Sequence, residues 1–95
     1  MIYNNVILKA RDLADIANLQ ELLITQAKVS LTETGCERFE VYHSAAEPGV
    51  FLLIEWWATQ ADLDAHRSAP HFVDVYKPKV MPLVQRIPHP SSRLI

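Results

Sequence analysis

An acidic side chain and two histidines follow one another in the second half of the chain, among apolar residues. Glu55 lies inside the apolar run of residues 50–57, and His66 and His71 come after it. A buried carboxylate costs several kcal/mol unless it is paired. A nearby imidazole would pair Glu55 and would also become a better base. We therefore expect Glu55 and His66 to border a pocket and move a proton, or to form a purely structural pair.

Further polar side chains could bind a ligand in such a pocket. Asn5, Tyr42 and Tyr76 could reach an aromatic ligand. The alternative for the tyrosines is a half-buried ring whose hydroxyl reaches water, and for Asn5 a hydrogen bond at a strand edge or turn. His71 follows Pro70 and is expected at the start of a helix.

The sequence indicates neither a metal nor a nucleotide cofactor. The four histidines lack the spacing of metal ligands, since His66 and His71 are five residues apart rather than four. The chain has only two glycines, so it has no glycine-rich phosphate loop. We expect no cofactor and no metal site.

The elements that would position these residues follow from hydrophobic periodicity. Alternating patterns predict strands over residues 3–10, 36–44, 50–58 and 80–87. Helical spacing predicts a first helix over residues 13–34, a second over 61–67 capped by Thr59, and a third that begins at Pro70 and ends near Pro78. Gly35 is placed to adopt a left-handed conformation after the first helix. The order β-α-β-β-α-α-β predicts an α+β, ferredoxin-like fold with helices on one face of an antiparallel sheet.

The strand over residues 50–57 is apolar on both of its faces. A sheet covered by helices on one side only should carry polar residues on the other. We therefore expect a second copy of the chain to cover the free face, forming a homodimer. Residues 1–88 are expected to form the single domain, and residues 89–95 a C-terminal tail or an arm across the neighbour.

Composition excludes several classes of protein. The chain has 95 residues, 49% hydrophobic and 21% charged, with a net charge of −2 and no long run of like charge. These values predict a globular domain without a nucleic-acid partner. No apolar run is long enough for a membrane span, and no leader segment is visible. The single cysteine, Cys36, cannot form an intrachain disulfide, which favours a reducing, cytoplasmic location.

Several short segments, taken in order, resemble the antibiotic biosynthesis monooxygenase family. They are Gly35-Cys36, the strand with Phe39 and Val41, the Glu-x-Trp segment at residues 51–57, the Ala-His at residues 65–66, and the Ser-Ala-Pro-His-Phe segment at residues 68–72. The similarity is greatest to the quinol monooxygenase and autoinducer-2-degrading isomerase branch. It implies a dimeric α+β barrel and, for many members, oxygenation of aromatic polyols by O2 without metal or flavin.

The resemblance also implies roles for particular residues. His66 would be the base, oriented by Glu55, and His71, Asn5 or Tyr76 would hold phenolic oxygens. The pocket walls would be Phe51, Leu53, Trp57 and Phe72.

The chain departs from two branches of the family. Leu53 stands where polyketide-modifying members carry an asparagine. His66 and Tyr76 stand where haem-degrading relatives carry a tryptophan and a histidine, which disfavours haem degradation. The leading interpretation is a cofactor-independent monooxygenase acting on a small hydroquinone-like aromatic. The alternatives are a non-oxidative isomerase or lyase acting on a small ketone, and a small-molecule-binding protein without turnover.

Overall fold

Four antiparallel strands form one sheet with the spatial order β2-β3-β1-β4. The computed structural model describes all of residues 1–95. The strands are β1 (Ile2–Ala10), β2 (Cys36–His43), β3 (Val50–Trp57) and β4 (Val84–Ser91). The three predicted strands β1, β2 and β3 are confirmed to within about one residue at each end. β1 and β3 occupy the centre of the sheet, so side chains on their two faces decide what the sheet can bury.

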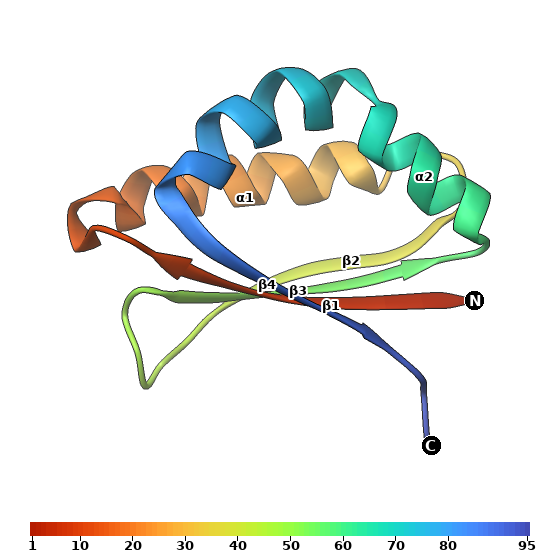
Figure 1. The fold of residues 1–95 in the computed structure, drawn as a ribbon, viewed down its shortest axis with the longest axis horizontal. Coiled ribbons are helices and arrows are strands. Elements are labelled where there is room, and N and C mark those ends of the chain that lie inside the picture. The colour runs from red at the N-terminus through yellow and green to blue at the C-terminus, as the bar shows by residue number, and fades with distance from the viewer.

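The helices all lie on one side of this sheet, as Figure 1 shows. They are α1 (Ile16–Ser30), α2 (Gln60–Ser68) and a π-helix, η2 (Phe72–Val80), with short 3-10 turns at Leu13–Asp15 (η1) and Met81–Leu83 (η3). The predicted α+β, ferredoxin-like fold and its element order are therefore confirmed.

Local capping explains where α2 begins. The hydroxyl of Thr59 accepts a hydrogen bond from the Asp62 backbone N–H at 3.1 Å and donates one to the Asp62 carboxylate at 2.9 Å. Both bonds stabilise the first turn, where backbone donors otherwise lack partners. The predicted cap of this helix is confirmed, and it fixes the position of every residue that α2 carries.

Two predicted helix ends are wrong. α1 ends at Ser30 rather than near residue 34, although Gly35 does adopt the predicted left-handed conformation, with φ of +79°. The third helix does not stop at Pro78 but continues to Val80 in π-helical form. A proline lacks the N–H needed inside an α-helix and its ring clashes with the preceding turn, whereas the wider π-helix relaxes that crowding.

The last strand is shifted along the chain from its predicted position. β4 runs over Val84–Ser91 rather than residues 80–87, so residues 89–91 extend the sheet instead of belonging to a tail. The pairing continues to the contact of Tyr3 with Ser91. Prolines at 88 and 90 are tolerated because β4 is an edge strand, where only alternate N–H groups bond to a neighbour.

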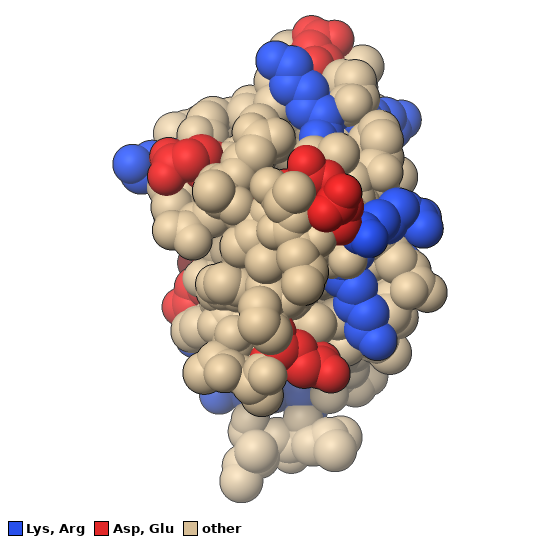
Figure 2. Space-filling model, turned by 90° about the vertical axis from the view of Figure 1, so that its left-hand side faces the viewer, with Lys and Arg blue, Asp and Glu red and all other residues tan.

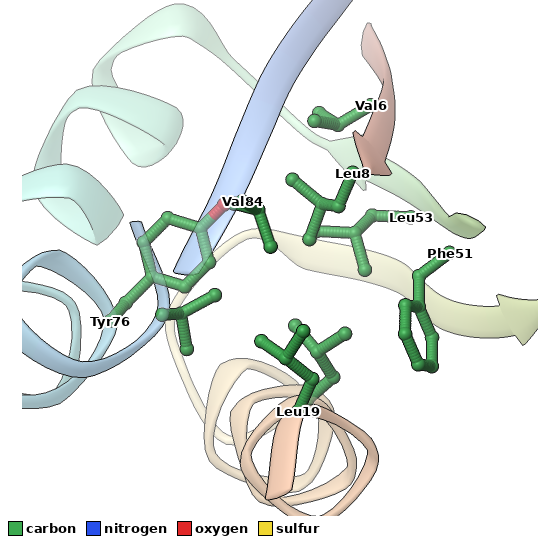
Figure 3. Close-up of a cluster of buried hydrophobic side chains, with 9 residues drawn as sticks. Val6, Leu8, Leu19, Phe51, Leu53, Tyr76 and Val84 are labelled. Carbon is green, nitrogen blue, oxygen red and sulfur yellow. The ribbon is translucent and has the colours of Figure 1, made fainter. Parts of the chain in front are cut away.

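The main core lies between the sheet and the helices. It contains nine buried side chains: Val6, Leu8, Leu19, Leu23, Phe51, Leu53, Tyr76, Val80 and Val84. Figure 3 shows Leu19 of α1 below the strand residues, and Tyr76 of η2 beside Val84 with its hydroxyl turned toward β4. A second, smaller cluster joins Phe39, Trp57 and Leu63 at the end of the sheet where α2 begins.

The opposite face of the sheet has no helix over it (Figure 1). The strand register aligns Tyr42, Leu52, Ile7 and Ile87 in one row across this face, and Arg38, Trp56, Tyr3 and Ser91 in another. Tyr42 and Leu52 are 48% and 36% exposed. On this outer face, the row through Leu52 and Ile7 is therefore mainly apolar and has no cover in the single chain, whereas the row between the two, with Glu40, Ile54, Asn5 and His89, is mostly polar.

Charged residues of both signs are mixed on the face of the molecule that Figure 2 shows, where they are scattered among uncharged ones. No helix has both the length and the apolar character required to span a membrane.

Candidate functional site

A small cavity lies between the sheet and the helices, where the core becomes polar. Its polar lining residues are Asn4, Gln26, Glu55, His66, Arg67, Tyr76 and Arg86, and its apolar ones are Phe39, Leu53, Leu63 and Phe72. The space between them is about 10 Å³, which is room for roughly one water molecule. The cavity is thus a small polar site, and an aromatic ring would enter only if side chains such as Phe72 moved.

Glu55 is at the centre of this site because of its place on β3. Strand alternation directs Leu53, Glu55 and Trp57 toward the helices. Glu55 is only 4% exposed, and its carboxylate accepts hydrogen bonds from Trp57 Nε1 at 3.1 Å and from Asn4 Nδ2 at 3.5 Å. Burial raises the pKa of Glu55, and the Trp57 hydrogen bond and the charges of His66 and Arg86 offset only part of that rise.

His66 comes to the same cavity from α2, packed in a box of aromatic rings. Its ring centroid lies 4.5 Å from that of Trp57 and 5.3 Å from that of Phe72. The expectation that Glu55 orients His66 is wrong. His66 Nδ1 lies 2.6 Å from Glu33 Oε1, and Glu33 belongs to the turn between α1 and β2. Glu55 shares the cavity with His66 but bonds to Trp57 and Asn4 instead.

Tyr76 and Arg86 form the wall of the cavity near β4. Tyr76 is 2% exposed, and burial raises the pKa of its hydroxyl, partly offset by the guanidinium of Arg86. Arg86 lies on the inner face of β4, opposite Leu8 of β1. A phenol and a guanidinium here could donate hydrogen bonds to an oxyanion.

Asn4, not Asn5, faces the cavity. Asn5 projects from the outer face, where its amide donates a hydrogen bond to Ser91 Oγ at 3.1 Å. Asn4 is 2% exposed and lines the site. The signal was present in the sequence, because Asn4 alternates in step with the buried residues Val6 and Leu8.

Three atoms of the lining residues have no hydrogen-bond partner although they are buried: Asn4 Oδ1, Gln26 Oε1 and Arg86 Nε. Leaving such groups unsatisfied costs about 1–3 kcal/mol each. Two of these atoms are acceptors and one is a donor. A water or a ligand with O–H groups could both donate to the two amide oxygens and accept from Arg86, so the lining is suited to a guest with hydroxyl groups.

The remaining predicted site residues divide into two groups. Leu53, Phe72 and Tyr76 line the cavity as expected. Phe51 does not line it, because it lies in the main core and stacks on His43 with centroids 4.5 Å apart. Trp57 is fully buried and reaches the site through its bond to Glu55.

His71 and Tyr42 lie outside the cavity. His71 does not line the site, although its Nε2 is buried without a partner. Tyr42 projects from the outer face and donates a hydrogen bond to Glu40 at 2.7 Å.

Sequence reasoning missed Glu33, Gln26 and Arg86. Gln26 follows Leu19 and Leu23 at helical spacing and is buried with them, which is a readable signal. Glu33 lies in the turn between α1 and β2, which carries no periodic pattern. Arg86 lies in β4, whose bounds differ from the predicted ones. No group of three or more His, Cys, Asp or Glu side chains is arranged to hold a metal ion.

Comparison with known proteins shows the family to which this chain belongs. The sequence model described as Antibiotic biosynthesis monooxygenase matches residues 14–77, a segment that includes Glu33, Glu55, His66 and Tyr76. The chain belongs to the antibiotic biosynthesis monooxygenase family. Among curated proteins it is similar to Rv0793 of Mycobacterium tuberculosis, which carries the provisional name of a monooxygenase, with 32% identity over 68 residues. That alignment spans 72% of this chain and 65% of the relative's length.

Solved structures agree with this membership. The structure of Rv0793 superposes with a TM-score of 0.85 at 25% identity, covering 99% of this chain and 95% of that one. A structure described as an antibiotic biosynthesis monooxygenase gives 0.89 at 18% identity over the full length of both chains. PA3566 of Pseudomonas aeruginosa gives 0.86 at 20% identity, covering 99% and 95% of the two chains. The last two likenesses bear on the fold alone.

Proposed function

We propose that this protein is a monooxygenase that oxidises a small hydroquinone-like aromatic with O2 and no cofactor. The observation that carries the proposal is the convergence of Glu55, His66 and Tyr76 on one buried cavity in a member of this family. Each of these groups can donate or accept a proton. Proton removal from a hydroquinone is the step that makes the substrate electron-rich enough to react with O2.

The reaction balances without an external reductant. One atom of O2 is inserted into a ring C–H bond, the other leaves as water, and the diol becomes a hydroxyquinone. The substrate supplies all the electrons, two from the hydroxylated carbon and two from the oxidation of the diol to the quinone. The protein must therefore provide a base, a dry cavity and donors for developing oxyanion charge.

The cavity residues have distinct roles in this proposal. His66 takes the phenolic proton, and Tyr76 and Arg86 donate to the oxygen that becomes negative. Glu55, whose pKa burial raises, can donate its own proton to a substrate oxygen when it is in the acid form. Substrate binding requires an open form of the cavity, and Phe72 is the half-buried side chain that would move to create it.

Oxygen consumption tests the proposal directly. Purified, metal-chelated protein is mixed with a panel of hydroquinones, and O2 uptake is followed together with the mass of the product under ¹⁸O2. We expect incorporation of one ¹⁸O atom at a rate proportional to protein concentration. Turnover without O2 uptake would instead support an isomerase or lyase acting on a ketone. Binding without any product would support a small-molecule-binding protein.

Assembly and location belong to the same proposal. We propose that a second copy covers the open outer face, because the row through Leu52 and Ile7 is apolar and has no cover within the chain. The single free cysteine, Cys36, is compatible with a reducing cytoplasm. Burial and the charges of Glu55 and Glu33 raise the pKa of its thiol to about 11, which keeps it unreactive.

A further inference from the structure

We propose that Glu33 is the positioning residue for His66 and the outlet for the proton that His66 removes from the substrate. The inference rests on the proposed function and extends it to a residue outside the cavity. Glu33 does not line the space in which the substrate would bind. It acts through the 2.6 Å contact between its Oε1 and His66 Nδ1.

The contact has a definite direction. An ionised carboxylate can only accept hydrogen bonds, so the proton between the two groups belongs to the imidazole. Neutral His66 is therefore the Nδ1–H tautomer, and the lone pair lies on Nε2. With Nδ1 occupied by Glu33, Nε2 is the nitrogen left to act as a base.

Both partners are held by the backbone. The turn that carries Glu33 is closed by hydrogen bonds from Glu33 N–H to the Ser30 carbonyl at 3.0 Å and from Cys36 N–H to the Glu33 carbonyl at 3.2 Å. At the end of α2, Ala69 N–H donates to the His66 carbonyl at 3.1 Å. The pair therefore joins two fixed segments, which is what a positioning contact requires.

The pair also crosses from the interior to the surface. The His66 side chain is 5% exposed and the Glu33 side chain is 19% exposed. His66 lines both the inner cavity and a separate surface hollow formed by Glu33, Thr34, Asp62 and Ala69 among others. A base enclosed by aromatic rings needs a route for the proton it has taken.

The proton balance of the route is simple. His66 Nε2 accepts the phenolic proton and becomes an imidazolium beside the Glu33 carboxylate. The Nδ1 proton then passes to Glu33 Oε1 and from there to water in the surface hollow. His66 is left as the Nε2–H tautomer. It regains the Nδ1–H form when the Nε2 proton passes to a reduced oxygen species in the cavity and Nδ1 takes a proton from water in the surface hollow, relayed by Glu33.

The contact between Glu33 and His66 also ties the α1–β2 turn to α2, so a purely structural role must be separated from a role in proton transfer. The tautomer of His66 separates the two roles. We would measure it by long-range ¹H–¹⁵N correlation on the imidazole, assigned with a His66→Gln variant, in protein without substrate. We expect the Nδ1–H form in the wild type and loss of that preference in Glu33→Ala.

The variant Glu33→Gln controls for the possibility that Glu33→Ala acts by destabilising the fold. Glutamine keeps the size of the side chain, but its amide can both donate and accept, so it no longer selects one tautomer. Glu33→Asp keeps the carboxylate and should restore part of the preference. The matched control is Glu37→Ala, since Glu37 is an exposed acid in the same segment and makes no side-chain hydrogen bond to the site.

Turnover of the best quinol completes the test. We expect Glu33→Ala and Glu33→Gln to lower kcat by about tenfold to a hundredfold with little change in KM, and Glu33→Asp to recover part of it. An unchanged Nδ1–H tautomer in Glu33→Ala would overturn the positioning role. A lower melting temperature with unchanged kcat would overturn the proton route. If no quinol is turned over by the wild type, the proposed function fails, while the tautomer measurement still decides the role of Glu33.

Discussion

The carboxyl group of Glu55 is almost completely buried, with 4% of the residue exposed. Folding removes it from water and raises its pKa above the ordinary value of 4.5. The folded protein therefore keeps a proton that the unfolded chain has already released over part of the pH range. Protonated Glu55 therefore contributes fully to the free energy of unfolding at pH values below its pKa in the unfolded chain. This contribution is lost as the pH rises through its pKa in the folded protein.

This linkage gives a prediction for Glu55→Gln. Glutamine has no proton to lose and can still accept the hydrogen bond from Trp57. We expect the variant to gain stability relative to the wild type as pH is raised from about 4 to about 8, measured by urea unfolding. Glu37→Gln is the control and should show no such trend. Parallel stability curves for Glu55→Gln and the wild type would contradict the buried-carboxylate account.

His66 gives a prediction about rate. If Nε2 of His66 takes the phenolic proton, His66→Ala should lower turnover of the best quinol by about 10² to 10⁴. The side chain also fills space beside Trp57 and Phe72, so the melting temperature should be recorded in parallel. His43→Ala serves as the control, because that ring stacks on Phe51 away from the cavity. Near wild-type turnover per folded molecule in His66→Ala would show that His66 is not the base.

Individual site residues could be predicted from the sequence only in part. Glu55, His66, Leu53, Phe72 and Tyr76 do meet at one cavity. The partner of His66 could not be foreseen, because the turn holding Glu33 meets α2 only after both have packed on the sheet. Strand alternation groups Asn4, and not Asn5, with the buried residues Val6 and Leu8, so this position is predictable from the sequence.

At the scale of the element, the turn at Gly35 controls how α2 meets β2. Gly35 has φ of +79°, and a Cβ placed there would lie 2.1 Å from Asp62 Oδ2, in the cap of α2. We expect Gly35→Ala to destabilise the protein by about 1–3 kcal/mol, from backbone strain and displacement of Asp62 together. Thermal unfolding followed by far-UV circular dichroism measures the effect.

Gly49→Ala is the matched control for that substitution. A Cβ at Gly49 would meet Leu13 Cδ2 at 3.3 Å and Ala10 at 3.8 Å, and Gly49 is not in the left-handed region. It should cost far less than Gly35→Ala. Equal losses from the two substitutions would show that the conformation of Gly35 is not what matters.

The wrongly predicted ends of the third helix and of β4 have the same physical cause. Local rules place a helix end at Pro78 and a strand at residues 80–87, yet Val80 is buried in the core at the end of η2. Burial of Val80 and pairing of β4 with β1 through Ser91 override the local signals. Both contacts are distant in sequence, so no window of neighbouring residues contains them.

For the whole molecule, the open outer face predicts the oligomeric state. We expect a homodimer by light scattering at low micromolar concentration, with an interface of roughly 2,000 Å² or more in total. Leu52→Lys places a charge in the apolar row and should yield a folded monomer. Leu31→Lys is the control, since Leu31 is 52% exposed and follows α1 on the helical side. A wild-type protein that is monomeric and folded at this concentration would refute the expectation.

The two prolines of β4 limit how copies of the chain can associate. Pro88 and Pro90 lie opposite Val6 and Asn4 of β1. A proline cannot donate to the ladder, so both occupy positions whose backbone nitrogen points to the free edge of the sheet. An incoming strand would therefore find two donors missing from this edge, and the sheet resists extension into a continuous intermolecular one. Two copies that pack through the faces of their sheets form a dimer that cannot grow further. Copies that add strands at the sheet edge would form fibres. The prolines of β4 disfavour the second mode of association.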